Sequence, residues 1–301
     1  MHKANYREFL NQRSRFHQPI PIRDETIQKK IHHTYRLQFM KDVVLARALD
    51  DSTFNVLNSC IIFNQIDIIN HVQNDVGFLR EVVGLYVDDD MLSGGGAKKK
   101  EADGMDIGND DGKPDGGDPE APNGQTSRAG LYAFAPPEKL TDEEKSIRSE
   151  VVFLIQQLCV IGKNVQLPAR MTLFRSLVDR GILFAVQWAL ALPEKEEKSK
   201  PIISAAGEVL AALLDHDLNG VRGHVLKQIV AIDKEREAQK KGADKADTLL
   251  ALLCKIMAQS RDLAVQSQVG DALKIWLEIP QNDAPEPNVS IYQLPCSGIA
   301  Y

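Results

Sequence analysis

The stretch "PARMTLFRSLVDRGILFAVQWALAL", residues 168–192, predicts two consecutive helices joined by a glycine. Pro168 fits a first helical turn, where its missing N–H has no partner to lose. Gly181 then separates the first segment from a more apolar one that begins with Ile182 and Leu183. Helix pairs of roughly 40 residues, with a glycine ahead of an apolar helix, are typical of armadillo and HEAT repeats. The stretch therefore predicts an all-α helical solenoid.

The segments around this stretch also have helical patterns, and no alternation of period two interrupts them. A capping box formed by Thr141 and Glu144 begins the preceding helix, which ends near Gly162. Asp217 is placed to cap a later helix. Further helices are expected over 201–217, 220–240, 246–260 and 261–279. Together these segments predict an armadillo-like block over 141–279.

A first helical block is predicted over 20–87, after a lead-in over 1–19. Its first helix follows Asp24, a suitable N-cap, and carries an apolar stripe along one face. We expect Asp51 or Ser52 to cap the next helix. The stripe consists of Ile27, Ile31, Tyr35 and Phe39, and the expected helices cover 25–46, 51–65, 66–73 and 76–86.

Residues 88–140 are rich in Gly, Asp, Lys and Pro and contain almost nothing to bury. Ordering them would cost about 1 to 2 kcal/mol per residue without a compensating core, so we expect a disordered acidic insertion. The two blocks should fold against one another across it, because solenoid repeats need neighbours to bury their faces. An irregular tail is expected over 280–301.

Composition and charge argue against two classes of ligand. The apolar share of 43% and the charged share of 26% are ordinary for a soluble globular protein. The net charge of −6 arises between Asp88 and Arg128, where eleven acidic and five basic residues occur, so the rest of the chain is neutral. No broad basic surface is left to attract nucleic acid, and the longest apolar run, 182–192, is too short to span a bilayer. We therefore expect a soluble protein that does not bind nucleic acid directly or cross a membrane.

Four cysteines are scattered along the chain without a C-x-x-C pair, and the start lacks a secretory signal. This pattern predicts reduced thiols, mostly in the core, of a nuclear or cytosolic protein. The cysteines are Cys60, Cys159, Cys254 and Cys296.

The histidines are weak candidates for a metal or acid–base site. His32 and His33 are consecutive, so on a helix they point about 100° apart and cannot both ligate one ion. His216 and His224 flank a helix start, where a capped turn competes with a metal or acid–base site, and we expect the capped turn.

Other motifs fail as chemical sites. "DGKPDGGDPEAP" at 111–122 resembles a calcium loop but has Lys113 and Pro122 where oxygen ligands are required. No complete phosphate loop, nucleophile elbow or catalytic cysteine–histidine arrangement is evident. We therefore expect no metal, no cofactor and no enzymatic activity, and no catalytic residue is nominated.

Two groups of charged residues have alternative interpretations. Four arginines either line a groove or serve surface solvation or intramolecular pairs with Asp179, Asp215 and Asp217, and we expect one of the latter roles. The charged run over 233–247 is either a docking site or a solvated helix end, and again we expect the second. The arginines are Arg170, Arg175, Arg180 and Arg222.

The opening of the first block closely resembles a known family. The residues that carry the resemblance are "DETIQKKIHHTYRLQFMKDVVLARALDDSTFNVLNSCIIFNQIDIINHVQNDVGFLREV" at 24–82. It continues with "EEKSIRSEVVFLIQQLC" at 143–159, "PARMTLFRSLVDRGIL" at 168–183 and "ISAAGEVLAALLDHDLNGVRGHVL" at 203–226. These segments resemble the central conserved domain of regulatory subunit 3 of protein phosphatase 4, the SMEK, Falafel and Psy family, in a fungal-like version. The likeness covers most of residues 20 to 280.

The resemblance implies a non-catalytic scaffold subunit with an armadillo-like centre. It implies binding to the phosphatase 4 catalytic subunit and core regulatory subunit, an indirect action on phosphoprotein substrates, and a role in the DNA-damage response in nucleus and cytoplasm. The alternative is a generic armadillo-like adaptor for assembly or transport that does not bind the phosphatase. Which surface binds a partner is left open, because periodicity alone does not reveal a binding face.

The chain departs from the family pattern at both ends. The family's N-terminal EVH1-type domain is expected to be missing, since about twenty residues precede the first helix. The end, "NDAPEPNVSIYQLPCSGIAY", breaks from the expected aromatic-rich continuation, so we expect a fragment or an altered gene model. Phe134 to Pro137, "FAPP", has the Phe-x-x-Pro form that resembles a ligand of the EVH1-type domain, although packing of Phe134 on the next helix is the simpler expectation.

Overall fold

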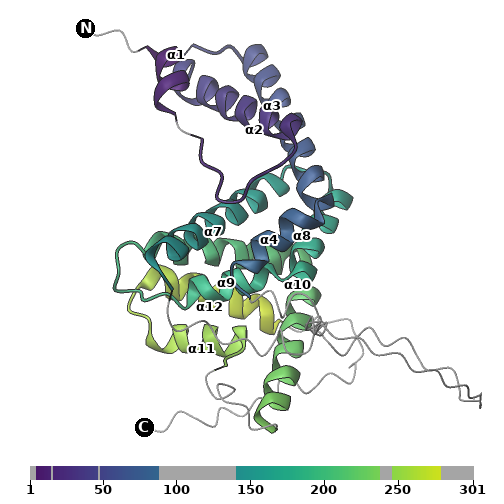
Figure 1. Ribbon diagram of the computed structural model, residues 1–301, viewed down its shortest axis with the longest axis vertical. Helices are drawn as coiled ribbons and strands as arrows, with labels where there is room; N and C mark the ends of the chain where they lie inside the picture. Colours follow the sequence, from purple (N-terminus) through teal and green to yellow (C-terminus); the bar gives the residue numbers. More distant parts are fainter. Residues whose placement is uncertain (1–4, 15, 47, 88–139, 238–245, 279–301) are drawn as a thin grey trace, which may run out of the picture.

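The computed structural model describes residues 5–14, 16–46, 48–87, 140–237 and 246–278 (Figure 1). Within these ranges the secondary structure is helical and contains no strand. The predicted all-α, armadillo-like class is confirmed. The insertion expected over 88–140 lies almost wholly outside the described residues, as do the tail over 280–301 and the Phe134 motif.

The N-terminal helices begin earlier than expected. A short helix α1 (Tyr6–Glu8) and a π-helical turn (Phe9–Arg13) precede α2 (Glu25–Phe39), which continues into a second π-helical turn (Met40–Val44). Asp24 caps α2 as predicted, because its Oδ1 accepts hydrogen bonds from the backbone N–H groups of the second and third helical residues at 2.8 and 3.0 Å.

Two predictions about the following helix were wrong. α3 (Asp51–Asn74) is one continuous helix rather than two, since no proline or glycine interrupts it. Its cap is Asp50 rather than Asp51 or Ser52, and the Oδ1 of Asp50 accepts from the Thr53 N–H at 2.6 Å. A short helix, α4 (Val76–Gly84), follows directly.

The helices after the gap form the body of the molecule. The predicted capping box of Thr141 and Glu144 begins the first of them, and Pro168 lies in the first turn of the second, as expected. The body consists of α7 (Asp142–Gly162), α8 (Leu167–Arg180), α9 (Ile182–Leu190), α10 (Lys200–Glu237), α11 (Leu249–Gln259) and α12 (Leu263–Leu277).

A kink replaces the loop expected within α10. Asp217 has φ −148° and ψ 55°, outside the helical region, and the helix resumes after it. Its Oδ1 accepts from the Gly220 N–H at 3.3 Å, which is the predicted N-cap contact. The chain therefore changes direction at this point without leaving the helix stack.

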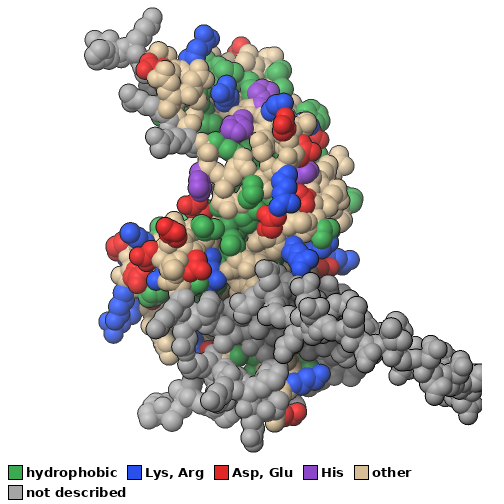
Figure 2. Space-filling model, viewed as in Figure 1, with side chains coloured by type: hydrophobic (Ala, Val, Ile, Leu, Met, Phe, Trp, Pro, Cys, Tyr) green, Lys and Arg blue, Asp and Glu red, His purple; other side chains and the backbone are tan. Residues whose placement is uncertain are grey.

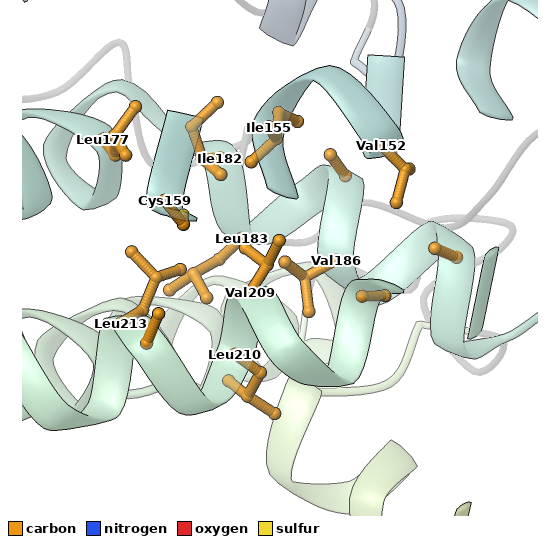
Figure 3. Packing of buried hydrophobic residues seen from close by; sticks show 14 of the residues in the cluster. Val152, Ile155, Cys159, Leu177, Ile182, Leu183, Val186, Val209, Leu210 and Leu213 are labelled. Atoms are coloured by element: carbon orange, nitrogen blue, oxygen red, sulfur yellow. The ribbon is translucent and has the colours of Figure 1, made fainter. Parts of the chain in front are cut away.

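One hydrophobic core joins helices from both sides of the 88–139 gap. It includes Val82 and Val83 of α4 and continues through α7, α8, α9 and α10 into α12. Figure 3 shows Ile155, Leu183 and Leu213, from three of these helices, among the side chains that converge in the body. The two predicted blocks thus bury apolar surface against each other, while their exact boundaries remain a prediction.

The segment between α1 and α2 crosses from the top of the molecule to the body. Ile20 and Ile22 are buried in the shared core. Arg23 forms an ion pair with Glu81 of α4 at 2.5 Å, and His17 Nε2 lies 2.7 Å from a carboxylate oxygen of α7. These contacts attach the start of α2 to the body. Within the described ranges, every helix is too short or too polar to span a bilayer.

Candidate protein interaction surface

The N-terminal arm, defined here as residues 5–63, extends from the body in Figure 1. In it α2 packs along α3, and the C-terminal part of α3 leads into the body, where the helix contacts α4, α7 and α8. The arm carries most of the exposed aromatic side chains of the described residues. They are Tyr6, Phe9, Phe16, Tyr35, Phe54 and Phe63, with Phe153 of α7 the exception.

One side of the arm is a seam of aromatic rings. Phe9 stacks on Phe39 with ring centroids 5.3 Å apart, and Tyr6 meets the same ring edge-on at 6.2 Å. Phe16 packs on the imidazole of His32 at 4.0 Å. These contacts fix the short N-terminal helix against α2 and leave much of each ring accessible to solvent.

The other side is a stripe along the outer face of α3. Val56, Cys60 and Phe63 recur at helical spacing, so they share one face of the helix. Phe63 is 67% exposed and Val56 is 59% exposed. We call these three residues the outer stripe. Figure 2 shows exposed hydrophobic side chains at this end of the molecule.

α3 itself carries few charged side chains near the outer stripe. α3 contains no Lys or Arg, and between its first residue and His71 its one acidic side chain is Asp67, which pairs with Lys30 of α2. Exposed apolar side chains among Ser and Asn, with few charges, resemble the centre of a protein interface. The geometry therefore favours binding of another protein over chemistry on a small molecule.

The four histidines that the sequence analysis considered lie against aromatic or amide side chains. His32 contacts Phe16, and His33 Nδ1 lies 3.4 Å from the amide nitrogen of Asn64. The rings of His216 and His224 pack on Phe174 and Phe184 at 4.3 and 4.9 Å. In the described part of the chain, no three His, Cys, Asp or Glu side chains gather as a metal site would require.

Burial sets the protonation of the two C-terminal histidines. Burial lowers the pKa of His224 to about 3, with a smaller effect from Lys227, so its ring is neutral at pH 7. Burial also lowers the pKa of His216, and the positive charges of Arg170 and Lys163 add to this shift against the opposing effect of Asp215.

Two of the four arginines donate to backbone carbonyls, so the pairing with aspartates that was one of the expected roles does not occur for them. Arg170 donates through Nε and Nη2 to the carbonyl of Val165, and Arg222 donates to the carbonyls of Trp276 and Glu278. Both guanidinium groups serve carbonyl oxygens at chain turns instead of carboxylates. Within the described ranges no ion pair joins either of them to Asp179, Asp215 or Asp217.

The cysteines also differ from expectation. Cys159 is buried, but Cys60 and Cys254 are exposed, so most of the described thiols are not in the core. Burial raises the pKa of Cys159 to about 12, with a smaller opposing effect from Lys163. Cys296 lies outside the described residues, as does the centre of the charged run over 233–247.

Sequence reasoning missed the outer stripe. The signal was present, because Val56 and Phe63 fall outside the spacing of the buried residues Leu57, Ile61 and Ile68. When a helix has apolar residues on opposite faces, the sequence pattern alone predicts that the helix is buried on all sides. Only the packing of α3 against α2 and the body shows that this second face is left exposed.

The stacked helices define an all-α, armadillo-like protein, and its arm exposes apolar side chains. A sequence model of the phosphatase 4 regulatory subunit 3 family matches residues 1–292, and the chain belongs to this family.

The chain is also similar to three curated proteins, two of which have names that support this family. An uncharacterised protein of Schizosaccharomyces pombe is 27% identical over 92% of this chain and 26% of its own length. Suppressor of Mek1 from Dictyostelium discoideum is 25% identical over 94% of this chain and 20% of its own length. Serine/threonine-protein phosphatase 4 regulatory subunit 3 from Drosophila melanogaster is 23% identical over 77% of this chain and 18% of its own length.

The chain spans about a quarter or less of the length of these relatives. No solved structure matches it.

Proposed function

We propose that this chain is a non-catalytic scaffold that binds the catalytic and core regulatory subunits of protein phosphatase 4. Family membership supports the connection to the phosphatase. The single structural observation that supports a scaffold is the outer stripe of α3, where Phe63 is 67% exposed on a helix without Lys or Arg. Covering such a surface with a partner removes apolar area from water at little electrostatic cost.

The proposed contact is between the outer stripe and an uncharged apolar surface of one of these two subunits. A partner surface rich in charge would lose hydration against α3 without gaining an ion pair. An apolar partner loses no such hydration, and aromatic anchors near the centre of an interface carry much of its binding free energy. Phe63 is therefore the expected anchor, with Val56 one to two turns away on the same face.

A pull-down with recombinant catalytic and core regulatory subunits tests this function. The wild-type chain should capture at least one subunit, and Phe63→Ser should weaken capture about tenfold or more. The matched control is Leu263→Ser on α12, since Leu263 is 79% exposed and lies far along the chain. Equal losses from both variants would contradict an interface on the arm. Capture of neither subunit by the wild-type chain would favour the generic adaptor.

Cys60 offers an independent test, because it belongs to the outer stripe and is exposed. Binding of the phosphatase subunits should protect Cys60 from maleimide labelling, measured by mass spectrometry of the digested complex. Cys254, exposed on α11, should stay as reactive in the complex as in the free chain. Unchanged labelling of Cys60 in a complex of proven stoichiometry would place the interface elsewhere.

The wider cellular role is also part of the proposal. The chain would direct the phosphatase to phosphoprotein substrates, act in the DNA-damage response, and occur in nucleus and cytoplasm. A tagged chain expressed in cells is expected in both compartments, and its loss should raise the phosphorylation of damage-response proteins after irradiation. A phosphatase assay of the purified chain alone is expected to give no activity.

A further inference from the structure

A second site lies at the turn between α7 and α8, beside the kink of α10. Lys163 ends α7, Arg170 lies in the first turns of α8, and His216 immediately precedes the kink at Asp217. Arg170 and Phe174 are four residues apart and so share a face of α8, and the Phe174 ring carries the His216 imidazole at 4.3 Å. The Lys163 and Arg170 charges therefore act on the imidazole of His216, which packs on the buried Phe174 ring.

Two of these groups are cations that form no ion pair within the described residues. Lys163 is exposed and Arg170 is half-buried. Among the residues that the structure describes, neither forms an ion pair, although nine other pairs are present elsewhere. Both act on His216 as positive charges, and Asp215 opposes them only partly. The carboxylates nearest to His216 in the chain are Asp215 and Asp217, and the Oδ1 of Asp217 already accepts from the Gly220 N–H.

The Arg170 guanidinium is held in position before any ligand arrives. Its Nε and Nη2 donate to the carbonyl oxygen of Val165 at 3.3 and 3.0 Å. A guanidinium has five N–H donors in a planar fork, so the Nη1 edge remains to donate to an anion. Fixing the group in advance reduces the entropy lost when the anion binds.

Apolar side chains stand beside the cations. Leu167 is 62% exposed and Met171 is 43% exposed, and they bracket Arg170 on the first turns of α8. A free inorganic anion gains nothing from such neighbours, whereas a peptide can place an apolar side chain against them. Cations that can bind an anion, next to an exposed apolar surface, therefore favour a phosphorylated protein segment as the ligand.

We propose that Lys163, Arg170 and His216 bind the phosphoryl group of a phosphorylated Ser or Thr in a segment of another protein, with an apolar neighbour of that residue packed on Leu167 and Met171. Arg and Lys supply charge-assisted hydrogen bonds to the phosphoryl oxygens, and His216 donates a further one when it takes up a proton. The phosphorylated segment would belong to a substrate that the scaffold brings to the phosphatase. This inference therefore rests on the proposed scaffold function.

Fluorescence polarisation with a fluorescently labelled peptide pool tests the site on the purified chain. The pool carries one phosphothreonine flanked by Leu, Ile or Met, and the matched pool carries threonine. The phosphorylated pool should bind at least tenfold more tightly, and Lys163→Gln should lower its affinity about tenfold. The control is Lys145→Gln, an exposed lysine about 27 Å away along the same helix, which should have no effect.

A second readout follows the His216 ring by NMR, with its signal assigned from His216→Gln. The pKa of His216 should rise when the phosphorylated pool binds, because the phosphoryl group offsets the charges of Lys163 and Arg170. Equal binding of both pools, equal effects of the two lysine variants, or binding of inorganic phosphate alone would overturn the proposal. Lys163→Gln should still capture the phosphatase subunits, because the proposed scaffold contact is on α3. Failure of the wild-type chain to capture either subunit would refute the scaffold function separately.

Discussion

The hydroxyl of Tyr86 donates a hydrogen bond of 2.6 Å to the carbonyl oxygen of Arg148, which lies 62 residues later in the chain. The two residues stand on opposite sides of the 88–139 gap. The Arg148 guanidinium lies over the rings of Tyr86 and Trp188 at 5.6 and 5.8 Å, and the two rings are themselves 5.6 Å apart. This cluster ties the end of the first block to the second.

Tyr86→Phe should lower the free energy of unfolding of both blocks together, in a single cooperative transition. The variant keeps the ring contacts but leaves the Arg148 carbonyl without the Tyr86 hydroxyl, which costs about 1 to 2 kcal/mol. Urea unfolding followed by circular dichroism should show a single transition shifted to lower urea. Two separate transitions, in either the variant or the wild-type chain, would contradict a shared core.

Replacing residues 90–138 by a Gly/Ser linker of about 12 residues should leave the melting temperature nearly unchanged. The contacts of Tyr86 with Arg148 and Trp188 anchor both ends of the replaced segment. Differential scanning calorimetry of the two chains measures the effect. A large drop in melting temperature would mean that the replaced residues contribute to the core.

Gly181→Ala should destabilise the chain by about 1 to 2 kcal/mol. Gly181 has φ +97°, and a Cβ placed there would lie 3.2 Å from the ring of the buried Phe184. Gly223→Ala is the matched control, since it lies in α10 with no atom within 4 Å of the added Cβ. That variant should stabilise the chain by about 0.5 to 1 kcal/mol, because alanine favours a helix over glycine.

His224 should make the chain less stable as the pH falls. Its folded pKa of about 3 lies below its usual 6.5, so the unfolded chain binds the proton more tightly. The stability is fully present above pH 6.5 and is lost progressively between 6.5 and about 3. Between pH 7 and pH 5 the loss is about 2 kcal/mol from this group. His224→Leu should show a smaller loss than the wild-type chain over the same interval in urea unfolding.

Gln228→Met should destabilise the chain by about 2 to 3 kcal/mol. The Gln228 side chain is 1% exposed, donates to Gln187 Oε1 at 2.7 Å and accepts from the Leu249 N–H at 2.9 Å. Methionine has a similar size but leaves the buried Leu249 N–H without its partner. Hydrogen exchange of the Leu249 amide should become faster, and unchanged exchange would show that another group has replaced the partner.

The sequence by itself determined the helices and most of their ends. Local signals suffice for this, because a side chain that caps a helix acts on backbone groups two or three residues away. Asp24, Thr141 and Asp217 therefore took the predicted roles, and Pro168 and Gly181 stand where a first turn and a break require them. The cap of α3 was misplaced by one residue because Asp50, Asp51 and Ser52 offer equivalent oxygens.

Only the tertiary structure decided which apolar residues are covered. Helical periodicity distinguishes the faces of one helix, but burial depends on neighbours that are distant in the sequence. Leu57 and Phe63 are both apolar residues of α3, yet one lies in a contact with other helices and the other faces solvent. Arg170 donates to a carbonyl oxygen for the same reason. The partner of a long side chain depends on which groups the packing of helices brings within its range. The arm and the turn between α7 and α8 became visible once the stack was in place.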